Sequence, residues 1–372
     1  MGKWKTCELG NLIKFQRGHD LPKSKMVAGK YPVVGSNGII GWHNEYTTEA
    51  PSITVGRSGN VGNPFIYYGR TWSHNTTLYI KEYKNTDPVF IYYFLKTLNL
   101  SNYAGGSAVP TLNRNHIHTL KISVPETIEE QHNIGIFLKL FDDKIQQNIR
   151  INKNLEALEQ AYFCNLFITN ANSNWRYGTL SDLGTIVGGG TPSKKHPEYY
   201  AKYDIPWITP KDLSIDRSKF ISRGENDISE LGFSNSSVTK MPKGTILFSS
   251  RAPIGYIAIA LNTVTTNQGF KSVIPNENVG SAFMYFLLKQ ALPTIEGMAS
   301  GSTFKEISGS GMKSVPVVIP DDETLQNFSE FCIPLFEQQI ILEAENRRLS
   351  SIRDILLPKL MSGKIDVSNI EL

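Results

Sequence analysis

Residues 128–166 read IEEQHNIGIFLKLFDDKIQQNIRINKNLEALEQAYFCNL, and this stretch decides the fold. Apolar residues return in it at alternating steps of three and four, a period of about 3.5 that is typical of a helix with one seam. Its seam positions are Ile134, Leu138, Phe141, Ile145, Asn148, Asn152, Leu155, Glu159, Tyr162 and Leu166. No proline interrupts the stretch, so we expect one long helix over 128–166.

A second stretch with the same period lies near the C-terminal end. Its seam positions are Leu325, Phe328, Cys332, Leu335, Gln339, Leu342, Asn346, Leu349, Arg353, Leu356 and Leu360. The two seams predict a coiled coil, and the alternative is that each helix packs only on its own domain. The acidic faces of the helices favour the coil because buried charge is unfavourable. Pro334 and Pro358 predict a kink or a late start in the second helix.

The features around the two helices occur twice, in the same order. Trp4, Leu9, Leu12 and Gly18 have the spacing of Trp175, Leu180, Leu183 and Gly189, and the run YYFLK (92–96) matches YFLLK (285–289). Asn152 and Asn346 hold equivalent seam positions, 194 residues apart. A period this long excludes a solenoid and indicates two copies of one module. The resulting division is a module at 1–127, a helix at 128–170, a module at 171–321 and a helix at 322–372.

The globular parts have the pattern of mixed helix and sheet. Residues 51–55 and 65–68 in the first module, and 245–248 and 256–260 in the second, are expected strands with Gly and Asn at the turns between them. With 372 residues, 40% of them hydrophobic and 19% charged, the chain is neither disordered nor a membrane protein, and two domains are expected. The start of the chain has no apolar signal region and the three cysteines form no motif, so we expect a cytoplasmic protein.

The net charge of +4 conceals alternating basic and acidic segments. Residues 1–125 hold 14 Lys and Arg against 6 Asp and Glu, and residues 171–320 hold 15 against 11. The helical segments are acidic, with 4 against 7 at 126–170 and 5 against 10 at 321–372. The basic segments would attract a polyanion such as nucleic acid, and the alternative is ordinary surface charge.

Enzyme motifs fail at the residues they require. The run GGGT (188–191) is followed by no lysine at phosphate-loop spacing, and in GSGMKS (309–314) Met312 replaces the required glycine. Asn63-Pro64-Phe65 lacks the second proline of an amino-methyltransferase loop, and no glycine-rich turn is present to hold a methyl donor. His116 and His118 could share a strand face, but no third ligand is near, so a metal is not expected. The chain is interpreted as a recognition protein.

Loops with paired donors and acceptors supply the candidate DNA-binding residues. Arginine suits guanine, asparagine and glutamine suit adenine, and lysine and hydroxyl groups hold phosphates. In the first module the candidates are Ser36, Asn37, Arg57, Ser58, Asn60, His74, Asn75, Thr76, Asn113 and Arg114. In the second module they are Thr191, Ser193, Lys194, Lys211, Ser250, Arg251, Asn267, Gln268, Ser302, Thr303 and Lys305. The alternative, strongest for Asn37, Asn60 and Asn113, is that these residues only form turns.

The second module contains the runs GGTPSK (189–194), IPWI (205–208), GTILFSSRAPIG (244–255), TNQGF (266–270) and GSTFKE (301–306). The helices contribute EEQ (129–131), NKNL (152–155), LLPKL (356–360) and GKI (363–365). Together these runs resemble the specificity subunit of type I restriction–modification systems over essentially the whole chain, and most strongly in the second module. The first module departs from this pattern and keeps only GRS (56–58) of the strand-end motif.

The resemblance implies an α+β fold with two mixed α/β target recognition domains in a pseudo-twofold repeat, separated by two long helices that form an antiparallel coiled coil. It implies that each domain reads one half of a split site in double-stranded DNA and that the helices set the spacing. Two methyltransferase subunits, using S-adenosylmethionine, and restriction subunits, using ATP and Mg²⁺, would be partners, with no cofactor, metal or membrane bound by this chain. Two other functions stay open: a self-contained DNA methyltransferase, and a coiled-coil adaptor that does not bind DNA.

Overall fold

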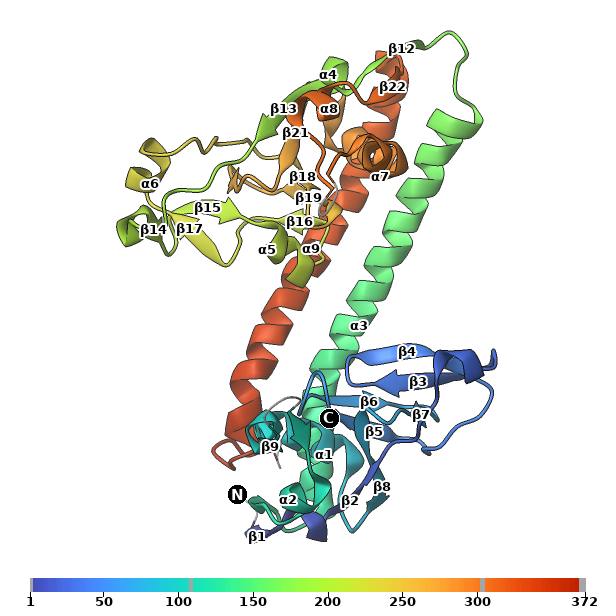
Figure 1. Ribbon diagram of the computed structural model, residues 1–372, viewed down its shortest axis with the longest axis vertical. Helices are drawn as coiled ribbons and strands as arrows, with labels where there is room; N and C mark the ends of the chain where they lie inside the picture. The colour runs from blue at the N-terminus through green and yellow to red at the C-terminus, as the bar shows by residue number, and fades with distance from the viewer. Residues whose placement is uncertain (1–2, 107–109, 302–304, 368–372) are drawn as a thin grey trace. The chain divides into compact units, whose positions relative to one another are not determined.

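The computed structural model describes residues 3–106, 110–301 and 305–367, and within them the chain forms two compact units. The first unit comprises 1–147 and 346–372, and the second comprises 148–345. The boundary falls inside both long helices, α3 (Ile128–Cys164) and α9 (Asp322–Leu360). Each unit therefore combines one module with a part of each helix (Figure 1).

The first module is built on a four-stranded sheet of order β2-β8-β5-β6 and a three-stranded sheet of order β4-β3-β7. Two further strand pairs are β1 with β11 and β9 with β10. The strands are β1 (Trp4–Glu8), β2 (Ile13–Arg17), β3 (Tyr31–Gly35), β4 (Gly38–His43), β5 (Ser52–Gly56), β6 (Pro64–Tyr67), β7 (Trp72–Ser73), β8 (Thr77–Tyr83), β9 (Ala104–Gly105), β10 (Thr111–Leu112) and β11 (Lys121–Pro125). The helices are α1 (Pro88–Thr97) and α2 (Arg114–His118).

The second module repeats this plan, with a five-stranded sheet of order β13-β21-β18-β19-β16 and a four-stranded sheet of order β14-β17-β15-β20. Its strands are β12 (Arg176–Thr179), β13 (Gly184–Gly188), β14 (Tyr200–Ala201), β15 (Ile205–Ile208), β16 (Phe220–Ile221), β17 (Asn226–Ile228), β18 (Ile246–Ser250), β19 (Ile254–Ala260), β20 (Thr265–Thr266), β21 (Lys271–Pro275) and β22 (Pro316–Ile319). Its helices are α4 (Leu180–Leu183), α5 (Pro210–Ile215), α6 (Glu230–Ser234), α7 (Gly280–Met298) and α8 (Gly309–Lys313).

The internal repeat is confirmed by the strand pairing. The antiparallel pair β1 and β11 of the first module corresponds to β12 and β22 of the second. The sheet order β2-β8-β5-β6 corresponds to β13-β21-β18-β19, and β16 is an addition at the edge of the second sheet. The four predicted strands are β5, β6, β18 and β19, each shifted by one or two residues from the expected bounds.

Local signals explain where several helices begin. Asp87 caps α1 by accepting the Phe90 N–H at 2.8 Å, and Pro88 occupies the first turn, where its missing N–H costs nothing. Thr179 with Asp182, and Thr209 with Asp212, form capping boxes at the starts of α4 and α5. These caps fix the entry of each helix into its module.

The two long helices run antiparallel, as contacts inside the second unit show. Asn148 donates to Glu345 at 2.8 Å, Gln339 donates to the Asn152 carbonyl at 3.3 Å, and the ring of Tyr162 lies 4.3 Å from that of Phe331. The residue number thus falls along α9 as it rises along α3. Every position of both predicted seams is buried or half-buried, so the seams are confirmed.

Of the kink or late start expected in the second helix, the late start is wrong. Helix α9 begins at Asp322, and its helical assignment continues through Pro334 and Pro358. Both prolines are exposed, as are Glu330 and Asp354, whose carbonyls lose a helical donor to the proline rings. Water can bond those carbonyls, so the cost of each proline is reduced.

Two acidic residues of the long helices are buried, and one of them, Glu159, holds a predicted seam position. Glu159 is fully buried, and Glu343 is 8% exposed. The charge of Glu159 is balanced by the Lys219 ammonium, which lies 2.5 Å away. None of the helices in the described ranges combines the length and apolar character that a membrane span needs.

Phe163 of α3 lies at the centre of the core of the second unit, and we predict its contribution to stability. Its ring contacts those of Phe167, Phe283, Phe286 and Phe328 at centroid distances of 5.1–5.9 Å. Phe163→Ala should lower the free energy of unfolding by ~3–5 kcal/mol because it leaves a cavity between α3, α7 and α9. Urea unfolding followed by circular dichroism measures the change.

The matched control for this prediction is Ile333→Ala, since Ile333 lies on α9 with 55% of its surface exposed. This change should cost under about 0.5 kcal/mol. Equal losses in the two variants would show that the aromatic cluster is not the core of the unit.

Candidate nucleic-acid interface

The structure brings most of the first module's candidate residues together around Thr76, in a group that we call the Arg57 cluster: Ser36, Arg57, Ser58, His74, Asn75 and Thr76. The Thr76 carbonyl accepts the N–H groups of Arg57 at 2.8 Å and Ser58 at 3.2 Å. Its hydroxyl accepts the Ser36 N–H at 3.3 Å and lies 3.1 Å from Nδ1 of His74. Three loops, after β3, after β5 and after β7, thus meet at one point.

Arg57 follows β5 directly, as its sequence position indicates. Its guanidinium donates to the Asn75 carbonyl at 3.4 Å, and its own carbonyl accepts the Leu112 N–H at 2.9 Å. This second bond brings the Asn113–Arg114 segment next to the cluster. Burial lowers the pKa of Arg57, and the nearby positive charge of Arg17 lowers it further. Among the described residues, the charged group that acts on the Arg57 guanidinium is another cation, Arg17, and not a carboxylate.

The remaining first-module candidates are arranged differently. Asn37 and Asn60 are exposed turn residues, and Asn113 caps α2 by accepting the Asn115 N–H at 3.0 Å. Within the Arg57 cluster itself, Asn75 also donates to the Asp20 carboxylate at 2.5 Å, and burial lowers the pKa of His74. The Asn113 side chain therefore has a local structural role in the free protein, as the alternative interpretation of this residue expects.

The second module has an equivalent group, the Arg251 cluster: Thr191, Ser250, Arg251, Asn267, Gln268 and Glu306. Arg251 follows β18, as Arg57 follows β5. The Thr191 hydroxyl donates to the side-chain oxygen of Gln268. The side-chain oxygen Oδ1 of Asn267 accepts the Gly269 N–H at 2.9 Å. The Ser250 N–H donates to the Gly269 carbonyl at 2.8 Å, which joins the two loops.

A carboxylate holds the cations of this second cluster. Arg251 lies 3.2 Å from Oε2 of Glu306, and Lys271 lies 3.6 Å from its Oε1. Arg251 and Glu306 are also joined by a backbone bridge, and Glu306 forms a second bridge with Ser300. In the free protein Glu306 therefore offsets much of the positive charge of this cluster.

Two second-module candidates, Ser250 and Lys211, already have partners within the protein, and others are exposed or lie outside the described residues. Ser250 is fully buried and its hydroxyl bonds to the Gly269 carbonyl at 3.2 Å, so its role here is structural. Lys211 is exposed and paired with Glu225 at 2.7 Å. Ser193, Lys194 and Lys305 are exposed on loops beside the cluster. Ser302 and Thr303 lie outside the described residues.

His116 and His118 lie on helix α2, so the expectation that they share a strand face is wrong. Nε2 of His118 accepts the Phe15 N–H at 2.9 Å, which gives this ring a structural role. In the ranges that the structure describes, no group of three His, Cys, Asp or Glu residues is placed to hold a metal ion.

Three important neighbours of the clusters were missed. Arg17 ends β2 beside Arg57, Asp20 holds Asn75, and Glu306 holds Arg251. The glycine match at Gly18 pointed to the segment that contains Arg17, at the end of β2, and Asp20, and Glu306 closes the run GSTFKE. Their charge pairing depends on contacts between distant segments, which the spacing of residues does not reveal.

The sequence matches the family model for the type I restriction modification DNA specificity domain twice, at residues 1–157 and 172–349. These matches cover most of the chain, and the chain belongs to this family. The two matched segments coincide with the two modules and the first part of the helix that follows each of them.

Two curated relatives are type I restriction enzyme specificity subunits. The chain is 45% identical over 158 residues to the MjaIX specificity subunit of Methanocaldococcus jannaschii, covering 42% of this chain and 36% of that protein. It is 32% identical over 194 residues to the HindI specificity subunit of Haemophilus influenzae, covering 51% and 42%. These matches thus span less than half the length of either relative.

A solved structure confirms the fold over nearly the whole chain. The S subunit of a type I restriction–modification system from M. genitalium superposes with a TM-score of 0.66 and covers 96% of each chain at 19% identity. At this identity the likeness concerns the fold. It supports the fold class expected from the sequence, with mixed helix and sheet modules joined to long helices.

Glu306→Gln tests the electrostatic arrangement of the Arg251 cluster. The change removes the negative charge that faces Arg251 and Lys271, so we expect tighter binding to DNA of random sequence and a salt dependence steeper by about one counterion. Fluorescence anisotropy with a labelled duplex at several salt concentrations measures both quantities.

The control for Glu306→Gln is Glu230→Gln, which removes a carboxylate from an exposed pair with Lys240 in the same module. It should leave the salt dependence unchanged. The same slope for both variants would place Glu306 away from the DNA.

Proposed function

We propose that this chain is the DNA-recognition component of a type I restriction–modification complex and that its two modules read two different halves of a split double-stranded site. One observation carries the proposal: two copies of a DNA specificity domain each place an arginine at the end of an equivalent central strand, Arg57 after β5 and Arg251 after β18. Around each arginine, side chains with amide and hydroxyl groups converge from separate loops. Such groups are suited to base edges and phosphates.

The two clusters offer different chemistry to DNA. Arg57 is bonded to a neutral carbonyl and lies near Arg17, so it presents a donor fork in a positive environment. Arg251 and Glu306 present a donor fork beside an acceptor, which matches the major-groove edge of a G·C pair, where guanine accepts and the cytosine amino group donates. We therefore infer that the half-sites differ and that the target is not a palindrome.

The chain itself is proposed to be non-catalytic. Two methyltransferase subunits with S-adenosylmethionine, and restriction subunits with ATP and Mg²⁺, would supply the chemistry, in the cytoplasm where the DNA lies. Support comes from the family, which is that of a DNA specificity domain, and from the relatives, which are named as specificity subunits.

Selection from a random duplex library tests the proposal against its two rivals. The full chain, alone and then co-expressed with its methyltransferase partner, should enrich duplexes that contain two short constant segments separated by a fixed gap. Enrichment of no motif under either condition would leave the adaptor as the function. Methyl transfer from S-adenosylmethionine by the chain purified without partners would identify a self-contained methyltransferase.

We predict that the two arginines act on separate half-sites. Arg251→Ala should reduce discrimination at one half-site by ~1–3 kcal/mol, and Arg57→Ala should do the same at the other half-site only. Competition binding with duplexes changed in one half at a time measures the effect, with Lys240→Ala as the surface control. An equal loss across all duplexes would mark either arginine as a phosphate contact or a structural residue.

We also propose that α3 and α9 set the gap, with half-site centres one DNA turn apart, ~34–36 Å. Four residues, about one helical turn, inserted in α3 should lengthen the gap and leave both half-sites unchanged. The insertion belongs after Gln147, where α3 passes from one compact unit to the other, because the Asn152 carbonyl is bonded to Gln339 within the second unit.

Mapping the methylated motif in cells that carry the insertion variant and its partners measures the gap. The same four residues inserted after Ala171, in the exposed connector behind α3, are the control and should leave the gap unchanged. Altered bases with an unchanged gap would show that the helices are not the ruler.

A further inference from the structure

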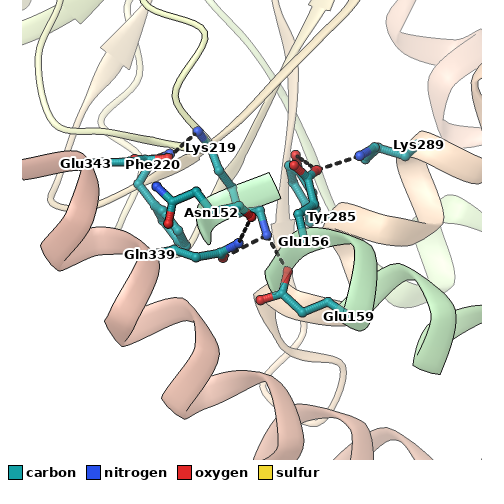
Figure 2. A network of polar contacts seen from close by, with 9 residues as sticks. All are labelled: Asn152, Glu156, Glu159, Lys219, Phe220, Tyr285, Lys289, Gln339 and Glu343. Carbon is teal, nitrogen blue, oxygen red and sulfur yellow. Dashed lines mark hydrogen bonds and ion pairs between the residues drawn. The ribbon is translucent and has the colours of Figure 1, made fainter. Parts of the chain in front are cut away.

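Lys219 is a buried lysine outside the DNA-binding clusters. It directly precedes β16, and its side chain is 5% exposed. Its ammonium donates to Oε2 of Glu159 on α3 at 2.5 Å and to Oε1 of Gln339 on α9 at 2.9 Å (Figure 2). One cation from the second module thus bonds both long helices at once.

The backbone around Lys219 makes further bonds to the same helix pair. The N–H groups of Lys219 and Phe220 donate to the two carboxylate oxygens of Glu343 on α9, at 2.9 and 3.2 Å (Figure 2). The Phe220 ring packs against that of Phe336, also on α9, at a centroid distance of 5.2 Å. The segment is held by its side chain, its main chain and its neighbour's ring together.

This site restricts the segment to one position. Glu159 is fully buried, and its other carboxylate oxygen has no hydrogen-bond partner among the described residues, so Lys219 is the charge partner on which it depends. The Lys219 ammonium lies 4.7 Å from the centre of the Phe336 ring and 5.2 Å from that of Tyr285. A shift of the segment would leave an unpaired charge in an apolar surrounding, which is strongly unfavourable.

Burial has the expected effect on both partners, since it lowers the pKa of Lys219 and raises the pKa of Glu159. A second pair lies alongside, in which Glu156 of α3 accepts from Lys289 at 2.6 Å and from the Tyr285 hydroxyl at 3.1 Å (Figure 2). Both Lys289 and Tyr285 belong to α7 of the second module. Charged groups from two separate parts of the module are therefore fixed on the same length of α3.

The bonds of Lys219 continue into the sheet that carries Arg251. The Lys219 carbonyl accepts the Ile259 N–H at 2.8 Å, and β16 pairs in parallel with β19. Strand β19 pairs with β18, and Arg251 is the residue after β18. Three consecutive hydrogen-bonded strands thus join the helix contact to the candidate base-reading arginine.

The first module contacts the long helices through different groups. The residue 194 positions after Glu159 is Arg353, which pairs with Asp142 on the other helix rather than with a module. The first module contributes the neutral hydroxyl of Tyr93, which donates to Asp142 at 2.5 Å. In its sheet β6 is the last strand, where the second module adds β16. Among the described residues, the buried module lysine that bonds both long helices belongs to the second module.

We propose that Lys219 is a positioning residue: it fixes the second module on the α3–α9 pair and so fixes the gap at which the second half-site is accepted. The inference rests on the proposed function. It assigns to Lys219 no contact with DNA and no part in choosing bases. Its loss should widen the range of accepted gaps while the bases of both half-sites stay the same.

The test uses the double variant Lys219→Met with Glu159→Gln, which removes both charges and leaves none buried without a partner. The full chain with its methyltransferase partner selects duplexes from a random library. The wild type should reject gaps one base pair longer or shorter by about a hundredfold, a penalty comparable to one or two mismatched base pairs. The double variant should reject them less than about tenfold, with unchanged half-site bases.

The matched control is Lys240→Met, which removes a lysine from an exposed pair in the same module and should behave as the wild type. A double variant that keeps the single wild-type gap, or that loses bases of the second half-site, would overturn the inference. If the wild type selects no motif at all, the proposed function fails, and this outcome is distinct from both.

Hydrogen exchange on the wild-type chain tests the inference without any variant. The amides of Lys219 and Phe220 should exchange as slowly as those in the middle of β18, because both are bonded to Glu343. Exchange at the rate of exposed loops would show that the segment is not held on the helices, and would also overturn the inference.

Discussion

The apolar seam between α3 and α9 is the constraint on which the rest of the structure depends. The core of the second unit contains Phe163 from α3 and Phe328 from α9 together with module residues. The core of the first unit contains Leu138 from α3 and Leu360 from α9 in the same way. Neither module has a complete core without both helices, so residues near the C-terminal end complete a unit that begins near the N-terminus. The pairing of the helices therefore contributes to the stability of both modules.

The elements that follow local rules could be predicted from the sequence. The 3.5-residue period gave both seams, and the repeat located matching strands in the two modules. Contacts between distant segments could not be predicted in this way. The late start of α9 was expected wrongly because Pro334 lies on an exposed face, where water can bond the freed carbonyl. The seam position of Glu159 was predicted, but its partner Lys219, 60 residues away, was not. Neither effect is visible in the residues next to the proline or the glutamate.

In the candidate interface, too, local patterns located some residues, and contacts between distant segments decided the rest. Spacing placed Arg57 and Arg251 at equivalent strand ends, and the structure gathers most of their neighbours around them. Sequence spacing could not show that Ser250 is buried while other candidate hydroxyl groups are exposed. Buried and exposed residues alternate along a strand only when one face of the sheet is solvated, and every residue of β18 is buried. It could not show the acidic partners either, since the pair of Arg251 and Glu306 joins residues 55 apart.

These acidic partners change what the charge distribution means. A basic segment whose cations are already paired within the protein gains less from a phosphate, because binding must first replace the internal pair. Lys211 and Arg251 in the second module each face a carboxylate, whereas Arg57 in the first module faces a carbonyl. Under the proposed function, affinity that is independent of sequence would therefore come more from the first module. The second module, whose Arg251 is paired with Glu306 and whose Lys219 is paired with Glu159 of α3, would contribute more to selecting a site than to holding DNA.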